Sequence, residues 1–554
     1  METAAEKVGT FEELLEVVRP LGRWQQFLLL QNALVTVFSC ATTVGAVFYQ
    51  ITPPYNCAVP GGFPNASAWT VQQKLNISSP TGDTGHFDPC RHYDLDYSRL
   101  SENFDEAFRQ IASLKNSSTA NTATCNYWEF DTTIDMSSTA VTQHQLVCQR
   151  RFGFENSQTA FFVGWLASNL VGGSLADRFG RRPVVLFFGP LAAVAATLMP
   201  FYPTYWLFVV GRFFVAFFAK VLGAVVFTLT LENLSKRHRT LLMGMFWVPY
   251  GVAQAAMGGV AYLCRDWVLF NTVLSAPIFL ICFYYFILPE SPRWLLVTQR
   301  VDQAERLMRS AAKWNGVVLP EGVDFKAISE ELRKNVAVSE KAANESFWTL
   351  FRVRNWRLVY PRVLRNSAVL LFTWFASGLV YYGILFNVSN YKGNRFLNNS
   401  LAGLVTVFSR LAAGPLLLLG RRASLSVTFL GTAIALVCVG TLLSLEVAHG
   451  GLLALTAALF AYLNIAAAFA ILYVVTGELV PTAARSMGFA VDSSVARIGS
   501  MLGIYVAAIK KLDSVSNIRW LSEGILCAFA VKTFGDAENL KKRIRESDSE
   551  KRRR

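Results

Sequence analysis

Eleven stretches of about 18 or more mostly apolar residues, separated by polar segments, run along this chain. A helix of that length crosses the roughly 30 Å hydrocarbon core of a bilayer, where backbone polar groups must be satisfied within the segment. Charged residues make up 16% of the chain, against about 25% in soluble domains. The pattern predicts an all-α membrane protein. The predicted helices are residues 27–51, 159–176, 183–202, 205–231, 241–262, 267–288, 366–386, 400–419, 425–446, 451–475 and 487–509.

The distribution of basic residues orients these helices. The net charge of +14 could suggest nucleic-acid binding, but Lys and Arg cluster in loops that fall on one side when the helices alternate. That bias marks the cytoplasmic side, so we expect membrane lipid and no nucleic acid around the protein. The first apolar run is too long for a signal-peptide core and is predicted to remain as a helix. The basic loops are Asp177–Arg182, Lys236–Arg239, the block 293–365, Arg421–Arg422 and Arg485.

The loop 52–157 is polar, much longer than ordinary connections, and predicted to lie outside the cell. Its four cysteines indicate two disulfides, with three possible pairings, because an even set in an oxidising compartment is usually oxidised. Metal binding through Cys90 and His92 is a weaker alternative, and we expect no metal and no cofactor. The cysteines are Cys57, Cys90, Cys125 and Cys148, and the glycosylation acceptors are Asn65, Asn76 and Asn116.

A charged run, Gly173–Arg182, joins two predicted helices and must lie at a membrane face, because its four charges cannot enter hydrocarbon. Its pattern, G-x-L-x-D-R-x-G-R-R, resembles the signature loop of the major facilitator superfamily. The resemblance implies that Asp177 lies against the amino end of a helix in the other half, latching the cytoplasmic gate and stabilising the outward-open arrangement. A merely solvated basic loop is the alternative. The gating residues would be Gly173, Asp177, Arg178, Gly180, Arg181 and Arg182.

An internal repeat predicts two pseudo-symmetric six-helix halves with a substrate site between them near the membrane midplane. In the second copy Leu417 and Leu418 replace Asp177 and Arg178, so the two halves are expected to gate unequally. The repeated elements are Gly180-Arg181-Arg182 with Gly420-Arg421-Arg422, 240 residues apart, and the pair Glu232 and Arg239 with Glu478 and Arg485, 246 residues apart.

Other motifs narrow the resemblance. The runs Cys125–Asp131, Gln145–Cys148 and Pro289–Leu296 resemble the organic anion, cation and zwitterion transporters of this superfamily. This implies a multi-pass plasma-membrane carrier working by alternating access, and it implies that Gln303–Trp314 lies along the inner membrane surface. The predicted order is a cytoplasmic amino terminus (1–26), the first helix (27–51), the extracellular loop (52–157), helices two to six (158–288), a cytoplasmic loop with amphipathic helices (289–365), the second half (366–531) and a basic tail (532–554).

The carboxyl end departs from the family pattern. The apolar stretch 520–531 reaches about 18 Å as a helix, short of the roughly 30 Å hydrocarbon core. The last span is either abbreviated, or about thirty expected residues are missing through splicing or a gene-model error, which is the explanation we favour. Transport by this form of the chain is therefore an open question at this point.

Four ionisable residues stand out deep inside predicted helices: Lys220, Arg410, Asp492 and Arg497. A charge there costs about 3 kcal/mol or more and is rarely accidental. Arg497 follows Arg485 by twelve residues, about 18 Å along a helix, and so lies near mid-membrane. The run Val495–Ser500 resembles organic anion and zwitterion carriers, which have Arg where cation carriers have Asp. A guanidinium binds a carboxylate through paired donors and repels an ammonium, so this position is predicted to select the sign of the substrate.

The other three charges allow alternatives. Arg410 falls where anion carriers have Lys if one residue is missing before Gly420, and otherwise Ser409 takes that place; Thr406 stands where cation carriers have Glu. Lys220 could bind substrate, pair with Asp492 or reach an interface. Asp492 could neutralise a basic residue of another helix or couple protons to transport.

Aromatic residues near these charges are predicted to form a flat wall that tolerates many ring-bearing anions while one Arg fixes the carboxylate. Helix packing is the alternative for each one. With Arg497, Arg410 and Lys220, the predicted substrate-binding residues are Tyr250, Gln254, Trp374, Tyr381, Tyr382, Phe469 and Tyr473.

The sequence therefore predicts a transporter of small organic anions or zwitterions, driven by a gradient or by exchange. No P-loop, H-E-x-x-H or G-x-S-x-G motif is present, so we expect no enzyme. An organic cation transporter, with Asp492 as its anionic contact, is the first alternative. A non-transporting receptor or a transport-dead truncated form is the second. The substrate, the coupling ion, the direction of transport and the oligomeric state stay open.

Overall fold

The computed structural model describes residues 9–58, 69–80, 87–95, 97, 100–101, 103–116, 121–132, 136–236, 238, 245–283, 287–352, 360–445, 450–479 and 485–509. The chain divides into two compact units. Unit 1 comprises Met1–Val47, Glu155–Leu263 and Phe270–Arg554, and unit 2 comprises Phe48–Phe154 and Cys264–Leu269. Unit 1 contains the apolar helices, and unit 2 contains the cysteine-rich loop.

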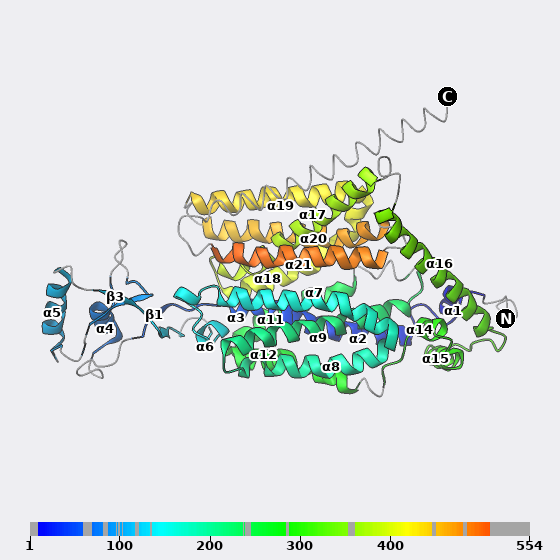
Figure 1. Cartoon of the computed structure of the whole chain (residues 1–554), viewed down its shortest axis with the longest axis horizontal. Helices are drawn as coiled ribbons and strands as arrows, with labels where there is room; N and C mark the ends of the chain where they lie inside the picture. The colour runs from blue at the N-terminus through cyan, green and yellow to red at the C-terminus, as the bar shows by residue number, and fades with distance from the viewer. Residues whose placement is uncertain are drawn as a thin grey trace, which may run out of the picture. The chain divides into compact units, whose positions relative to one another are not determined.

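The first half of the chain forms helices along the predicted apolar runs (Figure 1). Gly180 ends one helix and opens the next with a φ of +99°, a conformation that glycine adopts without strain. Arg181 can therefore start a new helix immediately. The helices are α2 (Arg23–Val44), α3 (Ala46–Tyr49), α7 (Gly153–Phe179), α8 (Arg181–Leu198), α9 (Tyr205–Glu232), α11 (Val248–Cys264) and α12 (Trp267–Ser275), which the 3-10 helix η5 (Ala276–Phe283) continues.

In the second half, α17 packs along α21 and α19 along α20 (Figure 1). Glycine permits the first contact. A Cβ at Gly378 would lie 2.1 Å from the backbone oxygen of Ala496, and one at Gly499 would lie 2.1 Å from that of Phe375. The two helices thus touch backbone to backbone at these positions. The helices are α17 (Tyr360–Leu385), α18 (Arg395–Leu416), α19 (Arg421–Ser444), α20 (Gly450–Leu479) and α21 (Arg485–Ile509).

Each of the eleven predicted ranges overlaps helical structure in the described part of the chain. Eight described helices are long and apolar enough to cross a membrane. α11, with 17 residues, is shorter, and α12 gives way to 3-10 geometry after 9 residues. The stretch 520–531 and the tail 532–554 lie outside the described residues, as does Arg239.

Four polar-surfaced helices of unit 1 share a separate hydrophobic core: α1 (Phe11–Val17), α14 (Pro292–Val297), α15 (Val301–Trp314) and α16 (Phe325–Arg352). The sequence predicts α15 against the inner membrane surface, but its apolar residues Met308 and Ala311 are buried within this protein core. Asn315 ties α1 to α2, because it accepts from the Trp24 amide at 2.9 Å and donates to the Val18 carbonyl at 2.6 Å. Protein therefore buries part of the apolar face of α15, and its position at the inner membrane surface stays a prediction.

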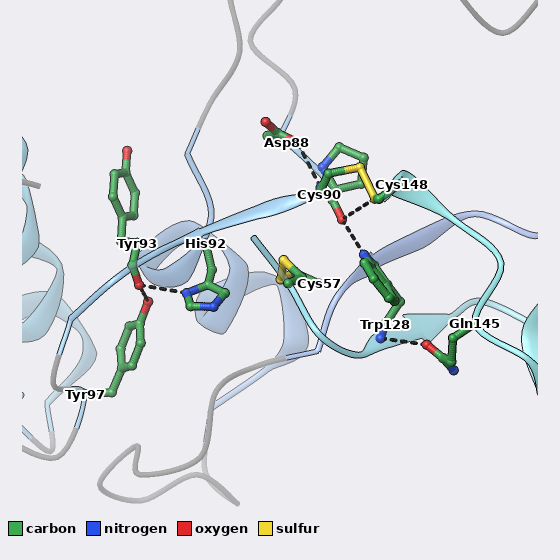
Figure 2. The surroundings of a disulfide bond; sticks show 11 residues. Cys57, Asp88, Cys90, His92, Tyr93, Tyr97, Trp128, Gln145 and Cys148 are labelled. Carbon is green, nitrogen blue, oxygen red and sulfur yellow. Dashed lines mark hydrogen bonds between the residues drawn. A yellow bond between two sulfur atoms is a disulfide. The ribbon is translucent and has the colours of Figure 1, made fainter. Parts of the chain in front are cut away.

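Unit 2 is built on two short antiparallel strand pairs and two disulfides. β1 (Tyr55–Cys57) pairs with β4 (Trp128–Phe130), and β2 (Arg91–Tyr93) pairs with β3 (Thr122–Thr124). Of the three possible pairings, the cysteines adopt Cys57–Cys125 and Cys90–Cys148. Figure 2 shows Trp128 beside them, donating its indole N–H to the Pro89 carbonyl at 3.1 Å. The disulfides thus brace strands that are too short to be stable alone.

Helices cover part of unit 2: α4 (Val71–Ser78), α5 (Phe104–Asn116) and α6 (Ala140–Gln143). A small core of Trp69, Ile77, Tyr97, Ala107 and Ile111 holds α4 and α5 together. Among the predicted glycosylation acceptors, Asn76 lies in α4, while Asn65 and the side chain of Asn116 lie outside the described residues.

Candidate functional site

Arg497 lies about half-way along α21 and is 3% exposed. Its guanidinium carbon is 3.7 Å from the centre of the Trp165 ring on α7, and Nη1 donates to the Tyr382 hydroxyl on α17 at 3.1 Å. Among the described residues, no hydrogen-bond partner reaches its buried Nε. One face and one edge of the guanidinium are thus held by the protein, and the N–H at Nε is left for another acceptor.

Lys220 approaches the same indole from α9, with Nζ 4.0 Å from the ring centre. It donates to the Ser39 hydroxyl at 2.6 Å, to the Thr43 hydroxyl at 2.8 Å and to the Ser39 carbonyl at 3.3 Å. An ammonium has three donors, so these contacts satisfy it. Of the three predicted alternatives, the structure places Lys220 at an interface, where it joins α9 to α2; a role toward substrate stays a prediction.

Arg212, also on α9, is a fully buried charge that the sequence analysis missed. It donates to Gln158 and, at 3.4 Å, to the Thr42 carbonyl, and its guanidinium lies 4.6 Å from the centre of the Phe161 ring. The rule that singled out Lys220, a charge inside an apolar run, would have found it. Arg212 and Lys220 both link α9 to α2 through polar atoms.

A second polar cluster joins the two halves through Gln254 of α11. Its Oε1 accepts from the Thr406 hydroxyl of α18 at 3.2 Å, and Tyr462 of α20 donates to Tyr381 of α17 at 2.9 Å. Thr406 and Tyr462 are 3.4 Å apart at their hydroxyl oxygens. The predicted residues Gln254 and Tyr381 thus lie in this cluster with Tyr462, which the prediction did not include because its apolar surroundings gave no signal; a role toward substrate stays a prediction. The cluster brings four helices together at one point.

Arg410 lies beside this cluster and is half-buried. Its Nη1 donates to the Ala466 carbonyl at 3.3 Å, while its Nε is buried and reached by no hydrogen-bond partner among the described residues. The neighbouring Ser409 uses its hydroxyl on the Thr406 carbonyl at 2.7 Å. Arg410 is therefore the one of these two alternatives that keeps a donor for a ligand.

Asp492 is 4% exposed and lies one and a half turns before Arg497 on α21. The Thr476 side chain lies close to its carboxylate, and Thr476 accepts from the Trp374 indole at 3.0 Å. Among the described residues, no hydrogen-bond partner reaches its Oδ2. The predicted pairing of Asp492 with a basic residue of another helix is therefore not seen in the described part of the chain.

The predicted aromatic residues of the second half lie in contact with one another. Trp374 packs edge-on against Phe469, with ring centres 5.5 Å apart, and against Tyr473 at 4.8 Å. Phe469 contacts Tyr381 at 5.5 Å, and Tyr381 contacts Tyr382 at 5.0 Å. An unbroken aromatic run thus leads from Trp374 to Tyr382. Tyr250 is buried on α11 and packs edge-on against Trp247 at 6.3 Å.

The charged run Gly173–Arg182, at the carboxyl end of α7, is held in place by a network of ion pairs. Arg181 binds Glu232 with two hydrogen bonds, of 2.8 and 3.0 Å, and pairs with Asp177 at 3.0 Å. Glu290 accepts from the backbone amides of Arg181 at 2.8 Å and Arg182 at 3.1 Å, so it caps the amino end of α8. Burial raises the pKa of Glu290 above its usual value, although these amides favour the carboxylate.

The second half repeats this ion pair, and no capping carboxylate is seen there among the described residues. Arg421 binds Glu478 with Nη2 at 2.7 Å and Nε at 3.0 Å, and Gly420 has the same positive φ as Gly180. The two pairs differ in burial: the side chains of Arg181 and Glu232 are 8% and 14% exposed, against 47% and 48% for Arg421 and Glu478. The repeat in the sequence thus corresponds to equivalent pairs of unequal burial. Arg239 and the side chain of Arg485 lie outside the described residues.

The predicted latch is not seen in the described part of the chain, and it stays a prediction. Asp177 is 75% exposed and pairs with Arg181 of its own loop, so its carboxylate is not engaged with a helix of the second half among the described residues. At the opposite ends of the helices the halves are closed, because Tyr505 donates to Asn156 at 2.6 Å and a Cβ at Gly258 would meet the Phe396 backbone at 2.3 Å. We interpret this as an inward-facing arrangement, which the latch would oppose. Of the remaining loop residues, Arg178 packs over the ring of the neighbouring Phe179. A Cβ added at Gly173 would meet no atom within 4 Å.

Comparison with known proteins gives a consistent result. A family described as sugar (and other) transporter matches residues 110–535. The chain is 28% identical to the organic cation transporter protein of Drosophila melanogaster over 91% of the chain and 87% of that relative. It is also 28% identical to the beta-alanine transporter of the same organism, over 89% and 81%, and 27% identical to solute carrier family 22 member 2 of Oryctolagus cuniculus, over 89% and 86%.

Among solved structures, the chain resembles the xylose transporter XylE from E. coli in its partially occluded inward-open conformation. The TM-score is 0.54 with 15% identity, covering 70% of this chain and 89% of XylE. At that identity the likeness concerns the fold, and it confirms the predicted architecture of the major facilitator superfamily.

Proposed function

The chain belongs to the sugar (and other) transporter family of the major facilitator superfamily and is a multi-pass membrane transporter, and from this premise we propose that it carries small organic anions or zwitterions across the plasma membrane. Arg497 would bind the carboxylate of the substrate. The relatives are named as carriers of organic cations, of beta-alanine and as solute carriers, so family membership leaves the charge of the substrate to be decided by the site.

One observation carries the choice of a negative group: among the described residues, no hydrogen-bond partner reaches the Nε of Arg497. A buried guanidinium with an unmet donor is costly, and a carboxylate relieves that cost by accepting the remaining donors in a fixed plane. Trp165 and Tyr382 hold the group in one orientation before any substrate binds, which lowers the entropy lost on binding. Arg410, with its own unpartnered Nε, supports a second contact with the same anion.

Substrate charge preference after substitution of Arg497 tests the proposal. Uptake of a labelled aromatic carboxylate and of a quaternary ammonium compound is measured in cells expressing the parent, Arg497→Asp or Arg497→Lys. We expect the parent to prefer the carboxylate, Arg497→Lys to keep that preference with at least tenfold lower affinity, and Arg497→Asp to lose it. A preference that is unchanged in Arg497→Asp, at equal surface expression, would remove Arg497 from this role.

An organic cation carrier is the second candidate, favoured by the unpartnered carboxylate oxygen of Asp492. In that case the parent itself would take up the quaternary ammonium compound in preference to the carboxylate. Surface expression without uptake of either compound would instead indicate a receptor or a form that does not transport.

A further inference from the structure

We propose that Asp492 is the second pole of the substrate site, where it receives the ammonium of a zwitterion whose carboxylate is held by Arg497. The inference rests on the proposed function, since it extends the site from one charged group to two. It assigns the carboxylate to substrate, in place of the proton coupling or helix pairing that the sequence allows.

The Asp492 carboxylate is buried, and this burial is the first observation that supports the proposal. It is 4% exposed, the Thr476 side chain lies close to it, and its Oδ2 has no hydrogen-bond partner among the described residues. A carboxylate accepts several hydrogen bonds, and burying one without a cation is expensive. A substrate ammonium would supply both the charge and the missing donors.

The aromatic side chains nearby are the second step. Thr476 fixes Trp374, whose ring packs against Phe469 and Tyr473, and Tyr473 stacks on Phe489 at 6.2 Å. Aromatic rings beside a carboxylate are the usual surroundings of a bound ammonium, because their faces attract positive charge. The surroundings of Asp492 therefore suit an organic cation better than a bare proton.

The path between the two poles is the third step. From Trp374 the rings of Phe469, Tyr381 and Tyr382 lie in successive contact, and Tyr382 accepts the hydrogen bond of Arg497. The charged groups thus stand at the two ends of one aromatic run, contributed by α17 and α20. A substrate with an apolar or aromatic body between its charges matches that order of groups.

The spacing of the poles limits the substrate further. Five helical positions separate Asp492 from Arg497, which is about 7.5 Å of rise and about 140° of rotation. In an α-amino acid the two charged groups sit on one carbon and cannot reach both side chains. The expected substrates are therefore ω-amino carboxylates with a ring or chain between the two ends.

A matched set of ligands and variants tests this in the full-length transporter. The ligands are 4-(aminomethyl)phenylacetate, its analogue without the amine, 4-methylphenylacetate, and phenylalanine as the compact zwitterion. Each competes with uptake of a labelled carboxylate by the parent, Asp492→Asn, Asp492→Glu and Arg497→Gln, at equal surface expression. We expect the parent to bind the extended zwitterion at least tenfold more tightly than either other ligand. Asp492→Asn should lose that advantage and keep its affinity for 4-methylphenylacetate within twofold, and Asp492→Glu should retain part of it.

Other results overturn the inference. If Asp492→Asn weakens the binding of both phenylacetates equally, or changes the pH dependence of both alike, the carboxylate acts on the fold or on a proton and not on the amine. If it changes neither, Asp492 does not meet the substrate. In both cases loss of all carboxylate uptake in Arg497→Gln would leave the proposed function standing, whereas unchanged uptake in Arg497→Gln would remove the proposed function itself.

Discussion

Lys220 and Arg497 both carry a positive charge into the membrane, but their hydrogen bonds differ. The ammonium of Lys220 has three acceptors on α2, while the guanidinium of Arg497 keeps a buried N–H unused. Both contact the Trp165 ring. From the sequence the two charges look equivalent. The acceptors around Lys220 show a residue that joins helices, whereas among the described residues the Nε of Arg497 has no hydrogen-bond partner, which supports the proposed role toward a ligand.

His144 makes unit 2 sensitive to acid. Burial lowers the pKa of His144 below its usual value of 6.5, so the folded unit resists the proton that the unfolded chain accepts. Stability from this group is complete above pH 6.5 and falls as the pH drops below it, by at most about 1.4 kcal/mol per pH unit. We expect cleavage of unit 2 by an added protease to increase between pH 7.5 and 5.5 in the parent, and the increase to be smaller in His144→Gln.

The matched variant is His92→Gln, which removes a half-buried histidine of the same unit. It should keep the acid-dependent increase of the parent. An increase of equal size in His144→Gln and the parent would assign the effect to other groups.

At the scale of helices, the repeat has produced two versions of one ion pair. The first is buried and continues into the carboxylate cap on α8; the second is half-exposed and carries no Asp in its loop, since Leu417 and Leu418 occupy those positions. Removing one partner of a buried pair leaves an uncompensated charge, whereas an exposed pair contributes little.

Arg181→Gln should therefore destabilise the protein much more than Arg421→Gln. We expect about 3–5 kcal/mol for the buried position and about 1 kcal/mol or less for the exposed one, measured as thermal unfolding of the purified transporter. The double variant Arg181→Gln/Glu232→Gln should recover part of the loss, because it leaves no unpaired charge. Equal losses at positions 181 and 421 would show that burial does not distinguish the two halves.

The positions of the helices can be predicted from the sequence, whereas many contacts of the candidate site cannot. Apolar length alone locates every described span, and the glycine-arginine repeat locates the paired loops. Contacts between helices distant in the chain carry no such signal: Trp165 and Tyr462 look like ordinary apolar residues, and only the fold brings them to Arg497 and Tyr381. The amphipathic pattern of α15 likewise does not say that protein buries Met308 and Ala311, and its position at the inner membrane surface stays a prediction.

For the whole molecule, transport requires the two halves to separate on one side as they close on the other. In the described structure the two halves meet where α18 packs against α11, and this close contact requires glycine, which has no side chain. A Cβ at Gly403 would lie 2.1 Å from the backbone nitrogen of Ala255, so α18 would be pushed away.

Gly403→Ala should thus disfavour the inward-facing arrangement and lower uptake at least tenfold without loss of surface expression. Separation of the outer ends can be followed with Tyr505→Cys and an impermeant thiol reagent, whose labelling rate from outside should rise. Gly414→Ala is the control, because it lies on the same helix and a Cβ there meets nothing within 4 Å. Equal labelling of the two variants would contradict this account of closure.

The exposed Asp177 and the sealed outer ends also determine where an inhibitor can act. Under this interpretation we expect a compound shaped to fit this conformation to reach its target from the cytosol, so a polar acid given to intact cells would be inactive until it entered by another route. Its membrane-permeable ester, cleaved inside, would block the carrier. Drug-discovery assays that add compounds only to the outer medium would pass over this class of inhibitor.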